Sequence, residues 1–244
     1  MTRVVRRWVV TGGSRGIGEA VARRALSEGD RVAIIARHPD RSPLASEYRD
    51  LCVTAAADIT DPDSIQAAIT DVELRWGGVD VLVNNAGIHR GGRIGRIARA
   101  DWQAVLDTNL SGAFDTIRAV LPAMGDGGSI VNVGAVVGLR GFKGDVAYAS
   151  AKAGLIGLTR ALAIELADRA ITVNLVLPGL TETEMVGGLS DAAKATLKAR
   201  VPLGRTAEAS EIADVIWNVA GSTYMTGSIV AVDGGLMAAL GSAQ

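Results

Sequence analysis

The sequence predicts an α/β fold in which a doubly wound parallel sheet of about seven strands is flanked by helices. Short apolar runs rich in Val and Ile recur along the chain, and longer segments of helical period separate them. Several of these runs are apolar at consecutive positions, which is typical of strands that are buried on both faces of a parallel sheet. In such a sheet the ligand binds in the crevice at the carboxyl ends of the strands.

The expected elements alternate along the chain. In order, the expected strands are RWVVT at 7–11, RVAIIA at 31–36, LCVTAAA at 51–57, VDVLV at 79–83, GSIVNV at 128–133, ITVNLVL at 171–177 and SIVAV at 228–232. Each is a short run dominated by Val, Ile, Leu or Ala, as strands inside a sheet require. The segments of helical period between them lie at 17–28, 62–75, 101–124, 147–168 and 209–220.

The bulk composition predicts one domain over 1–244. A chain of 244 residues lies at the upper end of a single domain, and a hydrophobic fraction of 48% is enough for a substantial core. The 25 basic and 26 acidic residues give a formal net charge of -1, so nothing draws the protein to nucleic acid or anionic lipid. No apolar run approaches the roughly 18 residues of a membrane span, and the N-terminal arginines precede no signal-peptide core. We therefore expect a soluble cytoplasmic protein.

The cysteine and the histidines indicate no metal chemistry. Cys52 is the only cysteine, which excludes an internal disulfide, and its apolar neighbours indicate a buried core thiol. The only histidines, His38 and His89, have no second imidazole or thiolate at metal-ligand spacing. We expect neither a metal site nor a histidine-based catalytic system.

Two long connections stand out. Residues 86–100 and 178–205 have the Gly, Pro and charge content of loops, and each follows an expected strand. Both therefore belong at the ligand edge of the sheet, where loops of this length are usually lids or binding loops.

The stretch TGGSRGIG predicts a dinucleotide site of the Rossmann type. Gly12, Gly16 and Gly18 lie directly between the first strand and the first helix. Glycines allow a sharp turn and a close approach to a pyrophosphate, whose charge the free N–H groups of the helix then meet. A glycine-rich turn alone would also suit a purely structural turn, but this position favours nucleotide binding.

The second strand favours NADP over NAD. It ends in Ala36, where an NAD-specific site would offer a carboxylate to the ribose 2′-hydroxyl. Arg37 follows, and Arg15 lies inside the glycine loop, so two guanidinium groups could converge on a 2′-phosphate. The alternative is that both arginines are solvated surface residues.

These motifs resemble those of the short-chain dehydrogenase/reductase family over nearly the whole chain. In the family's order, they are TGGSRGIG at 11–18, DIT at 58–60, NNAG at 84–87, TNLSGAF at 108–114, YASAK at 148–152, PGLTETEM at 178–185 and MTGSIVAVDGG at 225–235. The branch that looks most similar is the 3-oxoacyl-[acyl-carrier-protein] reductases, because of AGLIGLTRALAIELA, AEASEIADVIWNVAG and the C-terminal segment.

The resemblance implies roles for individual residues. Tyr148 would protonate the carbonyl oxygen, Lys152 would hold the nicotinamide ribose and make the phenol more acidic, and Asn109 would anchor a relay water. Asp58 and Ile59 would contact adenine, and Thr183 the nicotinamide end. The full set implied for the cofactor is Gly12, Ser14, Arg15, Ile17, Arg37, Asp58, Ile59, Asn84, Ala86, Gly87, Tyr148, Lys152, Pro178, Gly179 and Thr183. For Tyr148 and Lys152 the alternative is an ordinary exposed helical pair.

One position departs from the family's pattern. A Ser usually stands thirteen residues before the catalytic Tyr and donates a hydrogen bond to the substrate oxygen, but here that position is Ala135. Loss of such a donor typically lowers the rate about 10²–10³-fold. Ala135 could be a deliberate replacement, or natural, with a substrate hydroxyl, a water, Thr181 or Ser129 taking over. It could also mark a chain that has lost catalysis.

Two hypotheses follow. The first is an NADPH-dependent oxidoreductase that reduces a ketone, a 3-oxoacyl thioester or a polyketide-like substrate, with activity lowered or altered by Ala135. The second is a catalytically impaired nucleotide-binding or scaffold protein of the same fold. The resemblance also implies a homotetramer, and the arginines of 86–100 could attract the acidic surface of an acyl carrier protein. The substrate and the physiological direction of the reaction stay open.

Overall fold

The computed structural model, which describes residues 4–182 and 191–239, contains the expected parallel sheet. Its seven strands have the order β3-β2-β1-β4-β5-β6-β7, and every neighbouring pair is parallel. They are β1 (Arg7–Thr11), β2 (Arg31–Ala36), β3 (Cys52–Ala56), β4 (Val79–Asn84), β5 (Met124–Val133), β6 (Thr172–Pro178) and β7 (Ile229–Val232). The order reverses direction between β1 and β4, so the doubly wound fold is confirmed, with its switch point at the carboxyl ends of these two strands.

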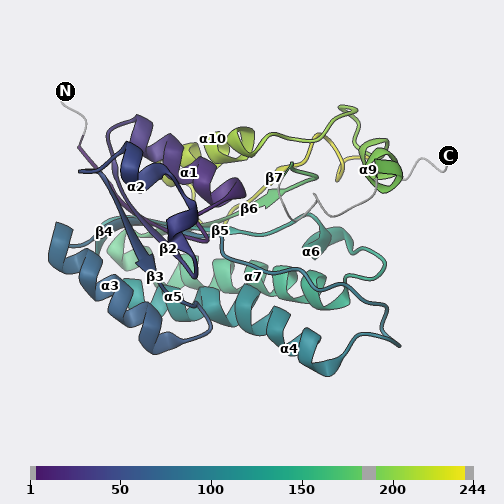
Figure 1. Cartoon of the computed structure of the whole chain (residues 1–244), viewed down its shortest axis with the longest axis horizontal. Helices are drawn as coiled ribbons and strands as arrows, with labels where there is room; N and C mark the ends of the chain where they lie inside the picture. The colour runs from purple at the N-terminus through teal and green to yellow at the C-terminus, as the bar shows by residue number, and fades with distance from the viewer. Residues whose placement is uncertain (1–3, 183–190, 240–244) are drawn as a thin grey trace.

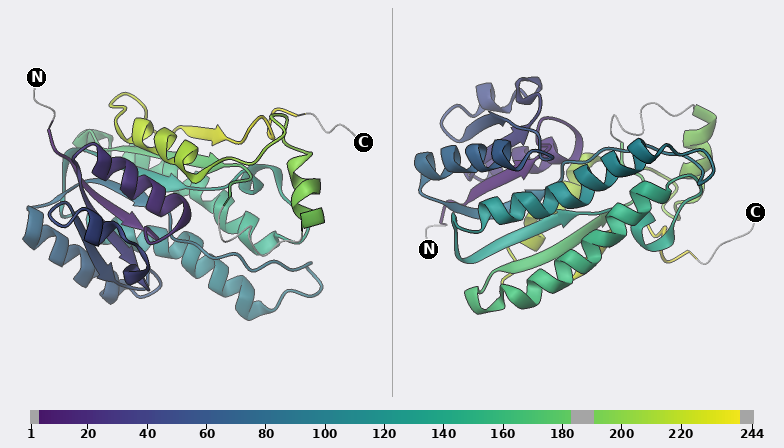
Figure 2. Two further views of the ribbon diagram at one scale, coloured as in Figure 1. Left: turned by 45° about the horizontal axis from the view of Figure 1, so that its top comes forward. Right: turned by 90° about the horizontal axis from the view of Figure 1, so that it is seen from below.

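Helices cover both faces of the sheet (Figures 1 and 2). One face carries α1 (Gly16–Ser27), α2 (Leu44–Glu47) and α10 (Ala209–Ala220). The other carries α3 (Pro62–Trp76), α5 (Gly112–Val120) and α7 (Val146–Glu165), with α4 (Arg99–Leu106) packed against α7. Two apolar cores result, one on each side of a sheet whose central strands are almost entirely buried.

Local sequence signals fix the ends of several helices. Asp61 accepts hydrogen bonds from the N–H groups of Asp63 and Ser64 at the start of α3, and Gly77 ends this helix in the left-handed conformation with φ of 76°. At α10, Glu208 and Glu211 form a reciprocal capping box.

Cys52 is buried, as expected, and burial raises the pKa of its thiol to about 11.

The structure corrects three of the expected segments. The segment 101–124 is not one helix: α4 passes through a π-helical turn (Asp107–Ser111) into α5, which ends at Val120. β5 then begins at Met124 rather than at residue 128, because Met124 pairs with Val79 at the start of β4. The connection 178–205 contains a helix, α9 (Asp191–Lys198), which was expected to be loop. No helix in the described ranges is long and apolar enough to cross a membrane.

Candidate active site

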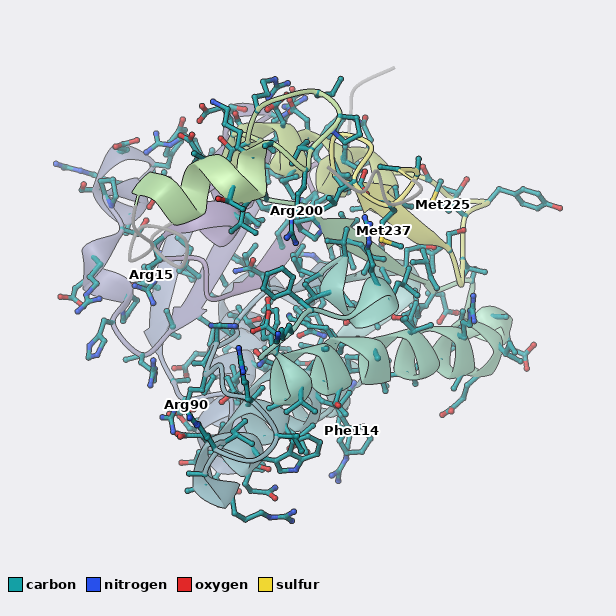
Figure 3. All side chains as sticks on the ribbon, turned by 90° about the vertical axis from the view of Figure 1, so that its right-hand side faces the viewer. Arg15, Arg90, Phe114, Arg200, Met225 and Met237 are labelled. Carbon is teal, nitrogen blue, oxygen red and sulfur yellow. The ribbon has the colours of Figure 1, made fainter. Side chains whose placement is uncertain are left out.

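A cavity of about 900 Å³ opens at the carboxyl edge of the sheet. Its walls come from the segments that follow β1, β2, β3, β4, β5 and β6, and from α7. Figure 3 looks onto this edge, where Arg15 belongs to the N-terminal elements and Arg90 to the connection before α4. The fold thus brings residues from widely separated parts of the chain to one long cavity.

The glycine loop forms the first wall. Gly12 has φ of +64°, and a Cβ atom there would lie 2.8 Å from the Cα of Ala86. A Cβ atom on Gly18 would lie 2.4 Å from both the carbonyl oxygen of Gly12 and the Nδ2 of Asn85. Arg15 precedes α1 without a side-chain cap, so the first N–H groups of α1 are left for a ligand. This combination fits a pyrophosphate.

The second wall is strongly basic. Arg15, Arg37, His38 and Arg41 all line the cavity beyond the end of β2. Asp58, after β3, accepts hydrogen bonds from the backbone N–H and the hydroxyl of Thr60 at 2.9 Å and 2.8 Å. These bonds, the backbone one above all, lower the pKa of the Asp58 carboxyl, and the charge of Arg37 lowers it further. His38 and Arg41 were not singled out from the sequence.

Asn84 does not lie on the cavity wall, although the resemblance implied a role at the ribose. It is 5% exposed, and its Nδ2 donates to the Oδ1 of Asn132 at 3.0 Å inside the sheet. The wall residue is Asn85, whose Nδ2 donates to the carbonyls of Thr11 and Gly12 and so braces the glycine loop. Asn84 is the last residue of β4 and is buried in the sheet, whereas Asn85, the first residue after the strand, faces the cavity.

Tyr148 and Lys152 lie together on the first turns of α7. The Nζ of Lys152 lies 5.7 Å from the centre of the Tyr148 ring and donates to the carbonyl oxygen of Val133 at 2.7 Å. Burial lowers the pKa of Lys152 to about 8, and burial together with the Asp145 carboxylate raises that of Tyr148 to about 12. The Tyr148 shift thus comes from burial and from Asp145, and the acidification of the phenol by Lys152 stays a prediction.

Asn109 does not line the cavity but holds one of its walls. It lies in the π-helical turn and is 2% exposed. Its Oδ1 accepts from the N–H of Ile88 at 2.9 Å, and its Nδ2 donates to the carbonyl of Ile88 at 2.8 Å. A Cβ atom on the neighbouring Gly87 would lie 2.5 Å from this Oδ1. The backbone after β4 is thus fixed beside Lys152.

Of the two side chains considered as substitutes for the missing Ser, only one reaches the cavity. Ala135 and Thr181 both line it. The hydroxyl of Thr181 donates to the carbonyl of Gly179 at 3.2 Å. Ser129 is buried near the middle of β5 and accepts a hydrogen bond from Thr172, so it is too far from the carboxyl edge to act.

The structure brings most of the other expected residues to the same cavity. These are Gly12, Ser14, Arg15, Ile17, Arg37, Asp58, Ile59, Ala86, Gly87, Tyr148, Lys152, Pro178 and Gly179. Thr183 lies outside the described residues. Among the described residues, no group of three or more His, Cys, Asp or Glu side chains is placed to hold a metal ion.

His89 was also not singled out from the sequence as a cavity residue beside Tyr148. His89 lines the cavity, and its ring packs edge-on against Tyr148 with the ring centres 5.2 Å apart and the planes at 77°. The Nε2 of His89 lies 2.9 Å from the Oδ1 of Asp145. Only its place in the 86–100 connection, at the ligand edge, could have indicated this from the sequence.

Comparison with known proteins identifies the family. A family model described as "Enoyl-(Acyl carrier protein) reductase" matches residues 12–237. The chain is 40% identical over 233 residues to the 3-oxoacyl-[acyl-carrier-protein] reductase FabG of Salmonella typhimurium, which covers 93% of this chain and 96% of that protein. It is 41% identical over 229 residues to the 3-oxoacyl-[acyl-carrier-protein] reductase of Rattus norvegicus, with the same two coverages of 93% and 96%.

A solved structure agrees with these relatives. The crystal structure of a blue fluorescent protein from a metagenomic library, in complex with NADPH, superposes with a TM-score of 0.87 at 35% identity and covers 95% of this chain and 97% of its own. The resemblance drawn from the sequence motifs is confirmed: the chain belongs to the short-chain dehydrogenase/reductase family.

Proposed function

We propose that this protein is an NADPH-dependent reductase that converts the ketone of a 3-oxoacyl thioester, or of a related polyketide-like substrate, to an alcohol. The observation that carries the proposal is the continuity of the cavity, which runs from the glycine loop at one end to Tyr148 and Lys152 at the other. The similarity to 3-oxoacyl reductases and to a structure determined with NADPH supports it.

The residues present fit the dinucleotide. The glycine loop and the N-terminus of α1 would hold the pyrophosphate, since Cβ atoms at Gly12 and Gly18 would collide with neighbouring atoms and open the tight turn that brings the backbone to the phosphates. Arg15 and Arg37, with Arg41 beside them, would bind the 2′-phosphate, while Asp58 and Ile59 would meet the adenine. When bound, NADPH supplies the hydride that is added to the carbonyl carbon.

Tyr148 supplies the proton. Its raised pKa keeps the phenol protonated through the neutral range, so its O–H can donate to the carbonyl oxygen and transfer its proton as the C=O bond becomes a C–O–H group. The buried Lys152 holds a positive charge near the phenolate that remains, and solvent then reprotonates Tyr148. Asn109 keeps the Ile88 backbone in place and could hold a water for this return.

The 3-oxoacyl group of the proposed substrate would be attached to an acyl carrier protein. Arg93 and Arg96 are exposed on the 86–100 connection, beside the mouth of the cavity, where a basic surface would attract an acidic partner. Changing both to Glu should raise the KM of a carrier-bound 3-oxoacyl thioester and leave that of a small thioester unchanged. Equal effects on the two substrates would contradict the carrier proposal and leave the reductase proposal intact.

The assembly proposed is a homotetramer built on the outer faces of α5 and α7. Phe114 on α5 is 45% exposed and Ile164 on α7 is 81% exposed, and large apolar side chains at such positions suit a subunit interface. In Figure 3, Phe114 projects away from the body of the molecule. Sedimentation analysis of the wild type and of a Phe114→Glu, Ile164→Glu variant tests this assembly.

The competing function is a nucleotide-binding protein without turnover, and Ala135 is the observation that favours it. One experiment distinguishes the two functions, in which NADPH binding and NADPH consumption are measured with a set of ketones. Both functions require binding, but only the reductase consumes NADPH. Tight binding without consumption would support the competing function.

A further inference from the structure

Beside Tyr148 the cavity is lined by a second polar side chain, His89, to which the proposed reduction assigns no role. His89 lines the cavity, whereas its partner Asp145 does not, so Asp145 approaches the imidazole from behind. Tyr148 contacts the face or edge of the same ring at 5.2 Å between centres. The imidazole, whose side chain is 37% exposed, therefore stands between a half-buried carboxylate and the space that the proposed substrate would occupy.

Hydrogen bonds hold the backbone next to both His89 and Asp145. The Asn109 side chain makes two hydrogen bonds to the backbone of Ile88, the residue before His89. The N–H of Gly92 donates to the carbonyl of Gly144 at 2.6 Å, next to Asp145. Two segments from distant parts of the chain are thus fixed against each other at the pair.

Gly91 lies against the pair. A Cβ atom on Gly91 would lie 3.2 Å from the Cε1 of His89 and 3.5 Å from the Oδ1 of Asp145. A side chain there would press on the imidazole, whereas it would meet the carboxylate at an ordinary contact distance. The position of the ring is therefore set by its hydrogen bond to Asp145 and its edge-on packing against Tyr148, with little space on the side of Gly91.

Only one ring nitrogen of His89 is available to donate a hydrogen bond to a ligand, because the other faces Asp145. With Nε2 facing the Asp145 carboxylate, Nδ1 is the remaining ring nitrogen, and in the protonated ring it is an N–H donor. The hydrogen bond to Asp145 raises the pKa of His89, against the opposing effect of burial, so the protonated form persists to higher pH than in a free histidine.

Position 135 lacks the second hydrogen-bond donor that a ketone reduction would require. Ala135 lines the same cavity but offers only a methyl group to a carbonyl oxygen that gains charge during reduction. A second donor beside the Tyr148 hydroxyl would stabilise that charge, because a preorganised donor in a water-poor site has a large effect on the rate.

We propose that His89, held by Asp145, is a further catalytic residue that donates a hydrogen bond to the carbonyl oxygen of the substrate alongside Tyr148. This role rests on the ketone reduction proposed above. His89 keeps its proton throughout: Tyr148 gives its proton to the oxygen, and the imidazolium only lowers the energy of the charged oxygen.

Other titratable or charged groups lie next to His89 or share its cavity. They are Asp145, which precedes α7, Tyr148 and Lys152 from α7, Asp107 from the π-helical turn, and Arg90 of its own segment, which pairs with Asp101 of α4 at 2.9 Å. Among these groups, Asp145 is the one that raises the pKa of His89. The donor is present below the pKa of His89 and lost above it, so the rate should fall as the pH rises through that pKa.

The test compares four proteins over a range of pH: the wild type, His89→Phe, His89→Gln and Asp145→Asn. His89→Phe keeps the ring against Tyr148 without its nitrogens, and His89→Gln keeps a donor that does not titrate. The matched control is Glu28→Gln, the same carboxylate-to-amide change in the exposed Arg24 and Glu28 pair of α1. NADPH binding is measured for every variant.

We expect His89→Phe to lower kcat/KM at least about 10-fold, with unchanged NADPH affinity and loss of the lower of two descending steps in the pH profile. His89→Gln should restore part of the rate without restoring that step. Asp145→Asn should lower the pKa of His89, which is measurable by NMR because His38 is the only other histidine.

An unchanged rate and an unchanged pH profile in His89→Phe, with an active wild type, would overturn the inference and leave the proposed function standing. A His89 pKa that Asp145→Asn does not move would overturn the role given to Asp145. A wild type that binds NADPH but reduces no ketone would instead overturn the proposed function itself, and the inference with it.

Discussion

The Nζ of Lys152 donates a hydrogen bond to the backbone carbonyl of Val133 at 2.7 Å, which ties the second turn of α7 to the carboxyl end of β5. Lys152 is 4% exposed, and its burial lowers the pKa to about 8. This contact therefore holds a titrating charge beside Tyr148 at the end of the sheet where the cavity opens.

Ketone reduction should weaken above about pH 8. Lys152 is cationic below its pKa of about 8 and loses its charge above it, whereas Tyr148, with a pKa of about 12, keeps its proton throughout. In a profile of kcat/KM measured in His89→Phe, one descending limb should therefore remain. In Lys152→Arg, whose guanidinium does not titrate, that limb should disappear, and Lys143→Met serves as the exposed control. A limb at the same pH in Lys152→Arg would show that another group causes it.

Arg15 and Arg37 should select NADPH over NADH. Each lines the basic wall of the cavity, and a charge-assisted contact with a phosphate is usually strong. Arg37→Ala and Arg15→Ala should each raise the Kd of NADPH about 10-fold or more and leave that of NADH nearly unchanged. Arg75→Ala, an exposed arginine on α3, is the control. Equal losses for both cofactors would place the arginines elsewhere than at the 2′-phosphate.

Two glycines should respond in opposite ways to the same substitution. Gly18→Ala would place a Cβ atom 2.4 Å from the Gly12 carbonyl, so the loop must shift, at a cost of about 1–3 kcal/mol in the free energy of unfolding and with weaker NADPH binding. Gly157→Ala on α7 meets nothing within 4 Å and should raise the free energy of unfolding by about 0.5–1 kcal/mol. Urea denaturation and NADPH titration measure both, and a Gly18→Ala variant as stable and as tight as the wild type would be inconsistent with a close-packed loop.

Restoring a hydroxyl at position 135 should increase the rate. In the His89→Phe background, where the proposed second donor is missing, we expect Ala135→Ser to raise kcat/KM about 10²-fold. With His89 intact the gain should be smaller, because two donors would serve one oxygen. No gain in either background would mean that the carbonyl oxygen does not lie next to residue 135.

The sequence predicted the sheet well because its strands are buried on both faces and leave continuous apolar runs. It failed where tertiary contacts decide. The π-helical turn at Asp107–Ser111 interrupts a helical pattern that continues on either side, and β5 begins early because Met124 pairs with Val79 at the start of β4. The helix α9 was missed because it is only eight residues long and lies in a segment whose Gly, Pro and charge content is typical of a loop.

At the site, glycines and charged residues within motifs were predictable, whereas partners distant in sequence were not. Asn84 and Asn85 are neighbours in the motif, but Asn84 ends β4 inside the sheet and Asn85 follows the strand on the cavity wall, which the motif does not reveal. The pairing of His89 with Asp145 joins residues 56 positions apart through backbone contacts that depend on the folded sheet. No pattern in either segment alone indicates it.

The most direct test follows NADPH absorbance with an acetoacetyl thioester, comparing the wild type with Tyr148→Phe. The account predicts that the wild type consumes NADPH and that Tyr148→Phe loses about 10²–10⁴-fold in kcat while it still binds NADPH. Consumption that is undiminished in Tyr148→Phe, or a wild type that binds NADPH and never consumes it, would contradict the account.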